Sequence, residues 1–170
     1  MKNKFSIITV VKNDKNNILT TIKSVKQQSY SNYEHIIFDG NSRDGTSQII
    51  KKNLNQKIKY FRQKDKNLYD AINKAILKAS GKYILIIHSG DFFFNEKTIE
   101  HINFSLSRDE DFLYGNLIFF DKLQIKRIWK FKKLNLNSSN SYKIAHPTLI
   151  LKKKIAKKIL YDTNFKISSD

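Results

Sequence analysis

The sequence predicts an α/β domain with a Rossmann-like, mainly parallel central sheet flanked by helices on both faces. Apolar runs rich in β-branched residues alternate with segments of helical periodicity through residues 1–110. Polar clusters follow the apolar runs, which is where ligands bind in open parallel sheets. The length of 170 residues fits one domain, so we expect a single unit over 1–170 with a small antiparallel addition within 111–170.

Four strands, the first two buried on both faces, and three helices are expected in the first part of the chain. The expected strands are 5–11 (FSIITVV), 33–39 (YEHIIFD), 58–62 (IKYFR) and 82–88 (KYILIIH). The helices are expected on the periodic sets Ile18, Leu19, Ile22 and Val25, then Ile49, Ile50 and Leu54, then Ala71, Ile72, Ala75, Ile76 and Ala79. Asp14 and Asp44 are candidate N-caps, and Ser80-Gly81 ends the third helix. Strict alternation implies right-handed crossovers.

The pattern changes after about residue 110. Residues 111–120 and 124–131 are expected to form an antiparallel pair around a turn. Another strand is expected within 141–153, and the Asn- and Ser-rich stretch 135–141 is the best candidate for a loop. Residues 151–160 combine apolar positions on one helical face with lysines elsewhere.

The charge balance is strongly basic, with 32 Lys and Arg against 15 Asp and Glu and a net charge of +17. Such a field attracts nucleic acid, acidic membranes or phosphorylated molecules, although a compositional bias toward Lys, Asn and Ile explains it equally well. The absence of cysteine excludes disulfides and thiolate metal sites. The apolar run that ends at Val11 is too short for a signal sequence or a membrane span, so a cytoplasmic protein is expected.

Two phosphate-binding signatures are absent from the sequence: GxGxxG after the first strand and GxxxxGK[ST]. An ordinary dinucleotide oxidoreductase or P-loop NTPase is therefore not expected. Other blocks occur in a characteristic order, namely SIITVVKN, TIKSVKQQSYSNYEHIIFDGNSRDGT, KDKNLYDAINKAILKASGKYILIIHSGD, HPTLILKKK and YDTNFKISSD. Together they resemble the family-2 glycosyltransferases with the GT-A fold, in particular bacterial enzymes of colanic-acid and O-antigen type.

The resemblance implies a GT-A-type nucleotide-sugar-binding domain that is cut short at its C-terminal end. Residues 1–110 would form the nucleotide-sugar-binding half and residues 111–170 the acceptor-side half. It implies an inverting enzyme that moves a sugar from a UDP- or GDP-sugar to a saccharide or lipid-linked saccharide, in cell-surface polysaccharide synthesis. A truncated, inactive relative that binds the nucleotide sugar is an alternative.

The resemblance also indicates donor-binding positions. These are Val11, Asn13, Asp39, Asp70, Asn73, Ser89 and Gly90. An acidic side chain at a strand end can accept the N–H of a nucleotide base, and Asp39 is the candidate. The alternative is that Asp39 only caps the turn before Gly40. Asp44 is expected to be structural, as a helix cap.

A divalent cation, Mn²⁺ or Mg²⁺, stabilises a diphosphate leaving group and prefers carboxylate oxygens. The family supplies these from a DxD-like segment after the fourth strand, which here reads His88-Ser89-Gly90-Asp91. It resembles the NSGD variant and leaves Asp91 as its one carboxylate and the expected metal ligand. Asp91 could instead cap a helix, and His88 is expected to be hydrogen-bonded at its strand end.

An inverting transfer needs a base that removes the proton of the acceptor hydroxyl. FKISSD resembles the family motif that carries this base, which makes Asp170 the candidate. Because Asp170 is the last residue, weak or absent transfer activity is expected of this chain. His146 matches an acceptor-side histidine, or is a buried structural one. Asp65 could approach the donor, or be a solvated loop carboxylate.

The lysine-rich segment 151–160, with Leu151, Ile155 and Ile159 on one face, could lie on anionic lipid at the inner face of the plasma membrane. A solvated lysine face is the alternative. A basic nucleic-acid-binding domain is a further alternative, because +17 and exposed aromatic residues would serve it. Acidic residues at the strand ends argue against it, so no nucleic acid is expected as a partner.

Overall fold

The computed structural model describes residues 2–121, 124–131 and 144–165. Its elements follow in the order β1 (Phe5–Val11), α1 (Ile18–Lys26), β2 (Tyr33–Asp39), α2 (Thr46–Lys52), β3 (Ile58–Arg62), α3 (Leu68–Lys78), β4 (Tyr83–Ile86), α4 (Thr98–Ser105), β5 (Phe112–Leu113), β6 (Leu117–Asp121), β7 (Gln124–Trp129), the 3-10 helix η1 (His146–Thr148), β8 (Ile150–Lys152) and α5 (Lys153–Lys158). The four strands and three helices expected before residue 88 are confirmed.

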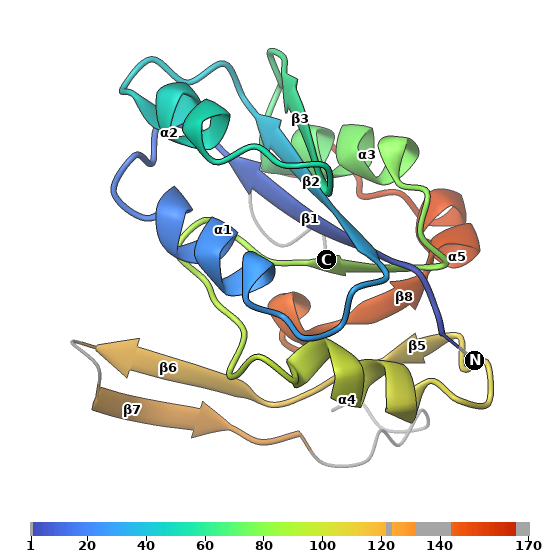
Figure 1. Cartoon of the computed structure of the whole chain (residues 1–170). Helices are drawn as coiled ribbons and strands as arrows, with labels where there is room; N and C mark the ends of the chain where they lie inside the picture. Colours follow the sequence, from blue (N-terminus) through green and yellow to red (C-terminus); the bar gives the residue numbers. More distant parts are fainter. Residues whose placement is uncertain (1, 122–123, 132–143, 166–170) are drawn as a thin grey trace.

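The main sheet has six strands in the order β3-β2-β1-β4-β8-β5 (Figure 1). The pairs β1–β2, β1–β4 and β2–β3 are parallel, whereas β8 runs antiparallel to both β4 and β5. The sheet is therefore mainly parallel with a short antiparallel side, which confirms the predicted fold class. Because β1 lies between β2 and β4, the carboxyl ends of these three strands meet at one edge.

Helices cover both faces of this sheet (Figure 1). Ile8 and Val10 of β1 pack with α3 and with Ala156 of α5 on one face. Ile7 and Val11 point to the opposite face, where α1, α2 and α4 contribute the packing residues. Both faces of β1 and β2 are thus buried, which explains why these strands read as continuous apolar runs.

The C-terminal part differs from its expectation in how the strands are divided. The expected antiparallel pair exists as the β6–β7 hairpin, which forms a separate two-stranded sheet. Residues 112–113, expected to belong to that pair, instead join the main sheet as β5 beside β8. Residues 114–116, which include Gly115 and Asn116, are not in a strand. They separate β5, which joins the main sheet, from β6, which joins the hairpin. The loop expected at 135–141 lies outside the described residues.

The amphipathic helix expected over 151–160 is shorter. Leu151 lies in β8, and the helix α5 covers only Lys153–Lys158. Its buried residue is Ala156, and the side chain of Ile159 is 59% exposed. The prediction that Leu151, Ile155 and Ile159 form one apolar helix face is therefore wrong, because Leu151 is paired in the strand β8. No helix among the described residues is long and apolar enough to cross a membrane.

The N-terminal ends of α1 and α2 test the two expected helix caps. Asn17 is the N-cap of α1, so the cap expected at Asp14 is wrong by position; the Asp14 carbonyl still accepts from the Ile18 N–H. The Asp44 carboxylate accepts from the Thr46 N–H at 3.0 Å at the start of α2. The expected structural role of Asp44 is therefore confirmed, although Gly45 occupies the cap position itself.

A buried polar network closes the edge of the sheet opposite the carboxyl ends of β1 and β2. The Glu34 carboxylate accepts from the Ser6 hydroxyl at 2.5 Å and from the Ser80 N–H at 2.6 Å, and pairs with Lys59 Nζ at 2.6 Å. Burial opposes the ionisation of Glu34, but the bonds from Lys59, Ser6 and Ser80 outweigh it and lower its pKa to about 2. This network fixes the amino ends of β1 and β2 to the turn before β4.

Candidate functional site at the carboxyl edge of the sheet

The loops after β1, β2 and β4 converge at one edge. Val11 and Asp39 are register partners at the ends of β1 and β2, and the segment His88–Asp91 follows β4 on the other side of β1. The structure thus brings Val11, Asn13, Asp39 and the segment 88–91 to the same edge of the sheet. This is the position at which open parallel sheets bind their ligands.

The loops after β1 and β2 are bonded to each other. The Asn13 N–H donates to the Ser42 hydroxyl at 2.8 Å, and the Asn13 side-chain oxygen accepts from the Arg43 N–H at 2.8 Å. Asn13 adopts a left-handed conformation, φ 52°, which asparagine tolerates better than most residues. Asn13 is therefore a fixed point of this edge, held by the loop that follows Asp39.

Asp39 is fully buried at the end of β2 and both of its oxygens are bonded. One oxygen accepts from the Ser42 N–H at 2.8 Å, and the other accepts from the hydroxyls of Ser47 at 2.5 Å and Tyr60 at 2.8 Å. Arg62 Nε lies 3.8 Å from the second oxygen. Burial opposes ionisation, but the hydrogen bonds from Ser42, Ser47 and Tyr60 outweigh it and lower the pKa of Asp39. The carboxylate organises its loop, and a nucleotide base would have to replace one of these donors to reach it.

Asp65 lies closer to this edge than a solvated loop carboxylate would. Its side chain is only 6% exposed and lies 3.6 Å from Lys12 Nζ. Its carboxylate occupies the space that a Cβ at position 40 would need, so Gly40 permits the approach. The solvated alternative is therefore wrong, and Asp65 joins the loops after β1 and β2 at the edge.

The segment that carries Asp91 is held by Thr21 of α1. The Thr21 hydroxyl accepts from the Gly90 N–H at 2.9 Å and lies 2.8 Å from the Asp91 carbonyl oxygen and 3.1 Å from that of His88. Gly90 has φ 95°, a conformation that an L side chain would strain. The Ser89 hydroxyl oxygen is buried without a hydrogen-bond partner in the described part of the chain. The turn is thus fixed through its backbone, which leaves its side chains to other contacts.

The Asp91 side chain is open to solvent, in contrast to Asp39. Desolvation by the surrounding protein nevertheless raises its pKa, an effect that His88 only partly offsets. No ion pair to a described lysine or arginine neutralises it. Asp91 does not head α4, which begins at Thr98, so the alternative of a helix cap is not supported.

Asp70 and Asn73 lie on α3 and are engaged within the protein. The Asp70 carboxylate accepts from the Lys66 N–H at 2.9 Å and pairs with Lys74 Nζ at 2.8 Å. Burial opposes its ionisation, but these partners outweigh it and lower the pKa of Asp70. Asn73 exchanges two hydrogen bonds with the backbone of Tyr161, at 2.8 and 2.9 Å. Asn73 therefore fastens the segment after α5 to α3.

His146 lies beside the end of β4. Its ring stacks on Tyr161 at 5.3 Å and meets the His88 ring edge-on at 5.7 Å, and its Nε2 lies 3.0 Å from the Tyr161 hydroxyl oxygen. Tyr161 stacks in turn on Tyr69 of α3. Sequence reasoning missed Tyr161, because nothing in the pattern around it signals this contact. Asp170 lies outside the described residues, so its assignment stays a prediction.

The donor atoms at this edge fit a cation only in part. No group of three or more His, Cys, Asp or Glu side chains among the described residues could hold a metal ion. Asp91 is a single carboxylate on the segment 88–91. Magnesium-type ions are commonly held by one or two carboxylates together with substrate phosphates and waters. Asp91 is therefore compatible with a cation that a bound diphosphate helps to hold.

Comparisons with known proteins identify relatives of this chain. An "Uncharacterized glycosyltransferase" of Haemophilus influenzae is 33% identical over 147 residues, which cover 82% of this chain and 59% of that protein. A "PGL/p-HBAD biosynthesis glycosyltransferase" of Mycobacterium tuberculosis is 27% identical over 119 residues, 67% of this chain and 46% of the relative. The chain thus spans less than two thirds of the length of these relatives.

Two solved structures share the fold. S. aureus TarS 1-349 in complex with UDP-GlcNAc superposes with a TM-score of 0.80 at 24% identity, over 98% of this chain and 51% of TarS 1-349. The mannosyltransferase PcManGT from Pyrobaculum calidifontis, in complex with GDP-Man and Mn²⁺, gives 0.70 at 13% identity, over 96% and 49%. The family model for glycosyl transferase family 2 matches residues 6–165, and this chain belongs to that family.

Proposed function

We propose that this chain binds a nucleotide-diphosphate sugar, UDP- or GDP-linked, at the carboxyl edge of β1, β2 and β4. In the complete protein the sugar is transferred with inversion to a saccharide or lipid-linked saccharide, in cell-surface polysaccharide synthesis. Two proteins with the same fold support the donor class, since TarS was solved with UDP-GlcNAc and PcManGT with GDP-Man and Mn²⁺. The observation that carries the proposal is Asp91, a solvent-open carboxylate with a raised pKa at this edge.

A divalent cation, Mn²⁺ or Mg²⁺, is proposed at Asp91. A cation there would neutralise the charge that develops on the diphosphate as the glycosidic bond breaks. The remaining ligands would come from the diphosphate and from water. The raised pKa of Asp91 supports this, because desolvation makes its negative charge costly until a cation compensates it.

The other residues of the edge are proposed to position the donor. Asn13 and Gly90 present backbone fixed by Ser42 and Thr21, and Ser89 adds a buried hydroxyl without a described partner. Asp39 acts on the donor through the loop that it organises, unless the base displaces one of its donors. Asp70 and Asn73 support the floor of the site from α3.

The acceptor side is proposed around His146, whose ring lies against His88 at the end of the same edge. Asp170 is proposed as the base that takes the proton from the acceptor hydroxyl while the oxygen attacks the anomeric carbon. The nucleotide diphosphate leaves from the opposite side, so one displacement inverts the configuration. We place this reaction in the cytoplasm, with peripheral membrane contact through residues 151–160.

Ligand-dependent thermal stability tests this proposal. We expect UDP-GlcNAc or GDP-mannose to raise the melting temperature in the presence of Mn²⁺, because a ligand of the folded state at one hundred times its Kd adds about 2.7 kcal/mol of stability. The variant Asp91→Asn should lose the Mn²⁺-dependent part and weaken nucleotide binding by about tenfold or more, since it removes a charged ligand.

The matched control is Glu100→Gln, which removes an exposed carboxylate from α4 and should leave the response unchanged. Equal Mn²⁺-dependent stabilisation of the wild-type protein and Asp91→Asn would contradict the assignment of Asp91. Absence of stabilisation by any nucleotide sugar would contradict the proposed function itself.

A further inference from the structure

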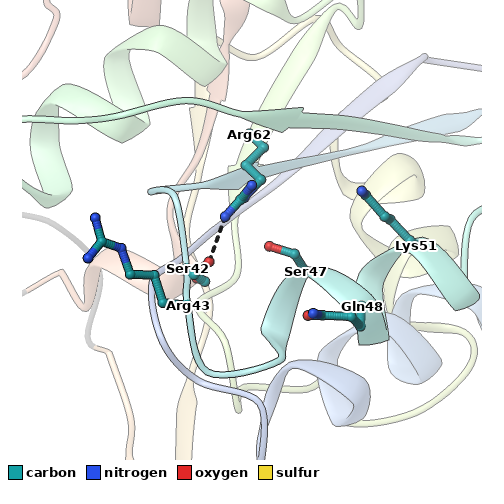
Figure 2. Close-up of a pocket in the computed structure, with 6 residues that line it drawn as sticks. All are labelled: Ser42, Arg43, Ser47, Gln48, Lys51 and Arg62. Atoms are coloured by element: carbon teal, nitrogen blue, oxygen red, sulfur yellow. Dashed lines mark hydrogen bonds between the residues drawn. The ribbon is translucent and has the colours of Figure 1, made fainter.

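A cavity of about 370 Å³ lies beside the donor edge, between α2 and the end of β3 (Figure 2). It is lined by Ser42, Arg43, Ser47, Gln48, Lys51 and Arg62. Figure 2 shows Arg62 and Ser42 facing Gln48 and Lys51, with Arg43 beside Ser42 and pointing away from Lys51. The three ionisable side chains in this lining are all cationic.

The two carboxylates nearest to this cavity in the chain are ionised and held by hydrogen bonds, and neither belongs to its lining. Asp39 is fully buried behind Ser42 and Ser47, with both oxygens bonded. Asp44 accepts from the Thr46 hydroxyl and from the N–H groups of Thr46 and Lys15, and these contacts lower its pKa to about 2. Neither acidic residue lines the cavity. Asp39 lies behind the wall, 3.8 Å from Arg62 Nε, and offsets part of the charge of that residue, so the excess positive charge of the lining comes mainly from Lys51 and Arg43.

The cations differ in how they are held. Arg62 donates from Nη2 to the Ser42 carbonyl at 2.8 Å and lies near Asp39, which fixes its guanidinium at the cavity wall while 43% of the side chain stays exposed. Lys51 and Arg43 have no ion pair with a described acidic residue. One cation is therefore preorganised, and two more can close on a ligand.

We infer that this cavity binds a small phosphate monoester through Arg62, Lys51 and Arg43. A phosphate monoester carries close to two negative charges at neutral pH and three acceptor oxygens, which suits a cavity lined by three cations better than a single carboxylate would. The volume lies at the lower end of the range for small-molecule sites, and the exposed amide of Gln48 suits a polar remainder such as a sugar.

The inference does not rest on the proposed donor site. Its residues lie on the loop between β2 and α2, on α2 and on β3, outside the segment 88–91 that would hold the cation. The two sites nevertheless share a wall, because the Ser42 hydroxyl accepts from the Asn13 N–H and the Arg43 N–H donates to the Asn13 side chain.

Titration of ¹⁵N-labelled protein tests the inference without nucleotide or divalent metal. Inorganic phosphate and glucose 1-phosphate are added in separate experiments at constant ionic strength, with sodium acetate as the monovalent anion control. We expect saturable shifts of the amide signals of residues 42–51 and 62 with one or both phosphates and none with acetate. Tighter binding of glucose 1-phosphate than of inorganic phosphate would show that the sugar part of the ligand also contacts the cavity.

Lys51→Gln and Arg43→Gln should each weaken this binding by about tenfold, the effect of one charge-assisted hydrogen bond. Lys52→Gln is the matched control, since it removes the same charge from the neighbouring exposed position of α2 but does not line the cavity. Equal binding by Lys51→Gln and Lys52→Gln, or shifts scattered over the lysine-rich surface, would overturn the inference. Displacement of the phosphate by UDP with Mn²⁺ would assign the cavity to the donor site and also overturn it.

Discussion

Glu34 ionises inside an almost fully buried network, and the variant Glu34→Gln measures what that ionisation contributes to stability. The pKa of Glu34 falls from an ordinary value of 4.5 to about 2 in the folded protein. Each pKa unit corresponds to about 1.36 kcal/mol, so the ionised carboxylate contributes roughly 3 kcal/mol at neutral pH. The bonds responsible come from Lys59, Ser6 and Ser80.

The sign of the pH dependence follows from the direction of this shift. The folded protein binds a proton at Glu34 more weakly than the unfolded chain does, so the contribution is complete above pH 4.5. It is lost as the pH falls from 4.5 toward 2. Near pH 3 about two fifths remains, so the stability difference between the wild-type protein and Glu34→Gln should shrink by about 2 kcal/mol between pH 7 and pH 3.

Urea unfolding followed by circular dichroism at pH 7 and pH 3 gives this difference directly. Other acidic groups also titrate in this range, but they do so in both proteins and cancel in the comparison. Glu100→Gln, which alters an exposed side chain on α4, is the control and should track the wild-type protein at both pH values. A difference between the wild-type protein and Glu34→Gln that is the same at pH 7 and pH 3 would refute the reasoning.

Two further predictions concern the donor edge and the lysine-rich segment. Thr21→Val removes the hydroxyl that accepts from the Gly90 N–H, and should cost about 1–3 kcal/mol of stability in urea and weaken Mn²⁺-dependent nucleotide binding. The exposed neighbour Thr20→Val should change neither measurement, and equal binding by the two variants would contradict a role of Thr21 in placing the turn. In co-sedimentation the protein should bind liposomes that contain anionic lipid, with a loss of about 1 kcal/mol for each of Lys154, Lys157 and Lys158 changed to Gln. Equal binding to liposomes with and without anionic lipid would contradict the proposed membrane contact.

The parallel part of the fold could be predicted because its signals are local and repeated. The strands β1 and β2 are buried on both faces, so each reads as an apolar run of seven residues. The helix α3 shows a periodic apolar face and ends at Lys78, with Ala79 as its C-cap, shortly before Ser80-Gly81. The local sequence of each segment indicates its secondary structure, and the alternation of strands and helices implies right-handed crossovers.

The antiparallel side could not be divided correctly for the opposite reason. The strands β5 and β8 have two and three residues, too few for a periodicity to be visible. Their place in the sheet depends on pairing across about forty residues of chain, between Phe112–Leu113 and Ile150–Leu151. Because Leu151 is paired in β8, the helix expected at 151–160 is shorter and covers only α5, Lys153–Lys158.

At the site, the sequence predicted which segments meet but not which side chains bond. The convergence of the loops after β1, β2 and β4 follows from strand order alone. The partners of Asp39 do not, because Ser47 and Tyr60 come from α2 and β3 and reach the carboxylate only through packing. The approach of Asp65 to Gly40 likewise depends on the missing side chain of Gly40 and on the path of the loop after β3.

Asp39 and Asp91 lie at the same edge of the sheet but differ in their surroundings, and this difference indicates different roles. Asp39 ends β2 and Asp91 follows β4, the two parallel neighbours of β1, so strand position alone assigns both carboxylates the same role. Their surroundings act in opposite directions: hydrogen bonds to Asp39 outweigh its burial and lower its pKa, whereas desolvation raises the pKa of Asp91. A further cation adds little to a carboxylate whose charge is already satisfied, and most to one whose charge is desolvated but still reachable from solvent. This difference supports the proposal that Asp91 holds the cation while Asp39 holds the loop against which the donor lies.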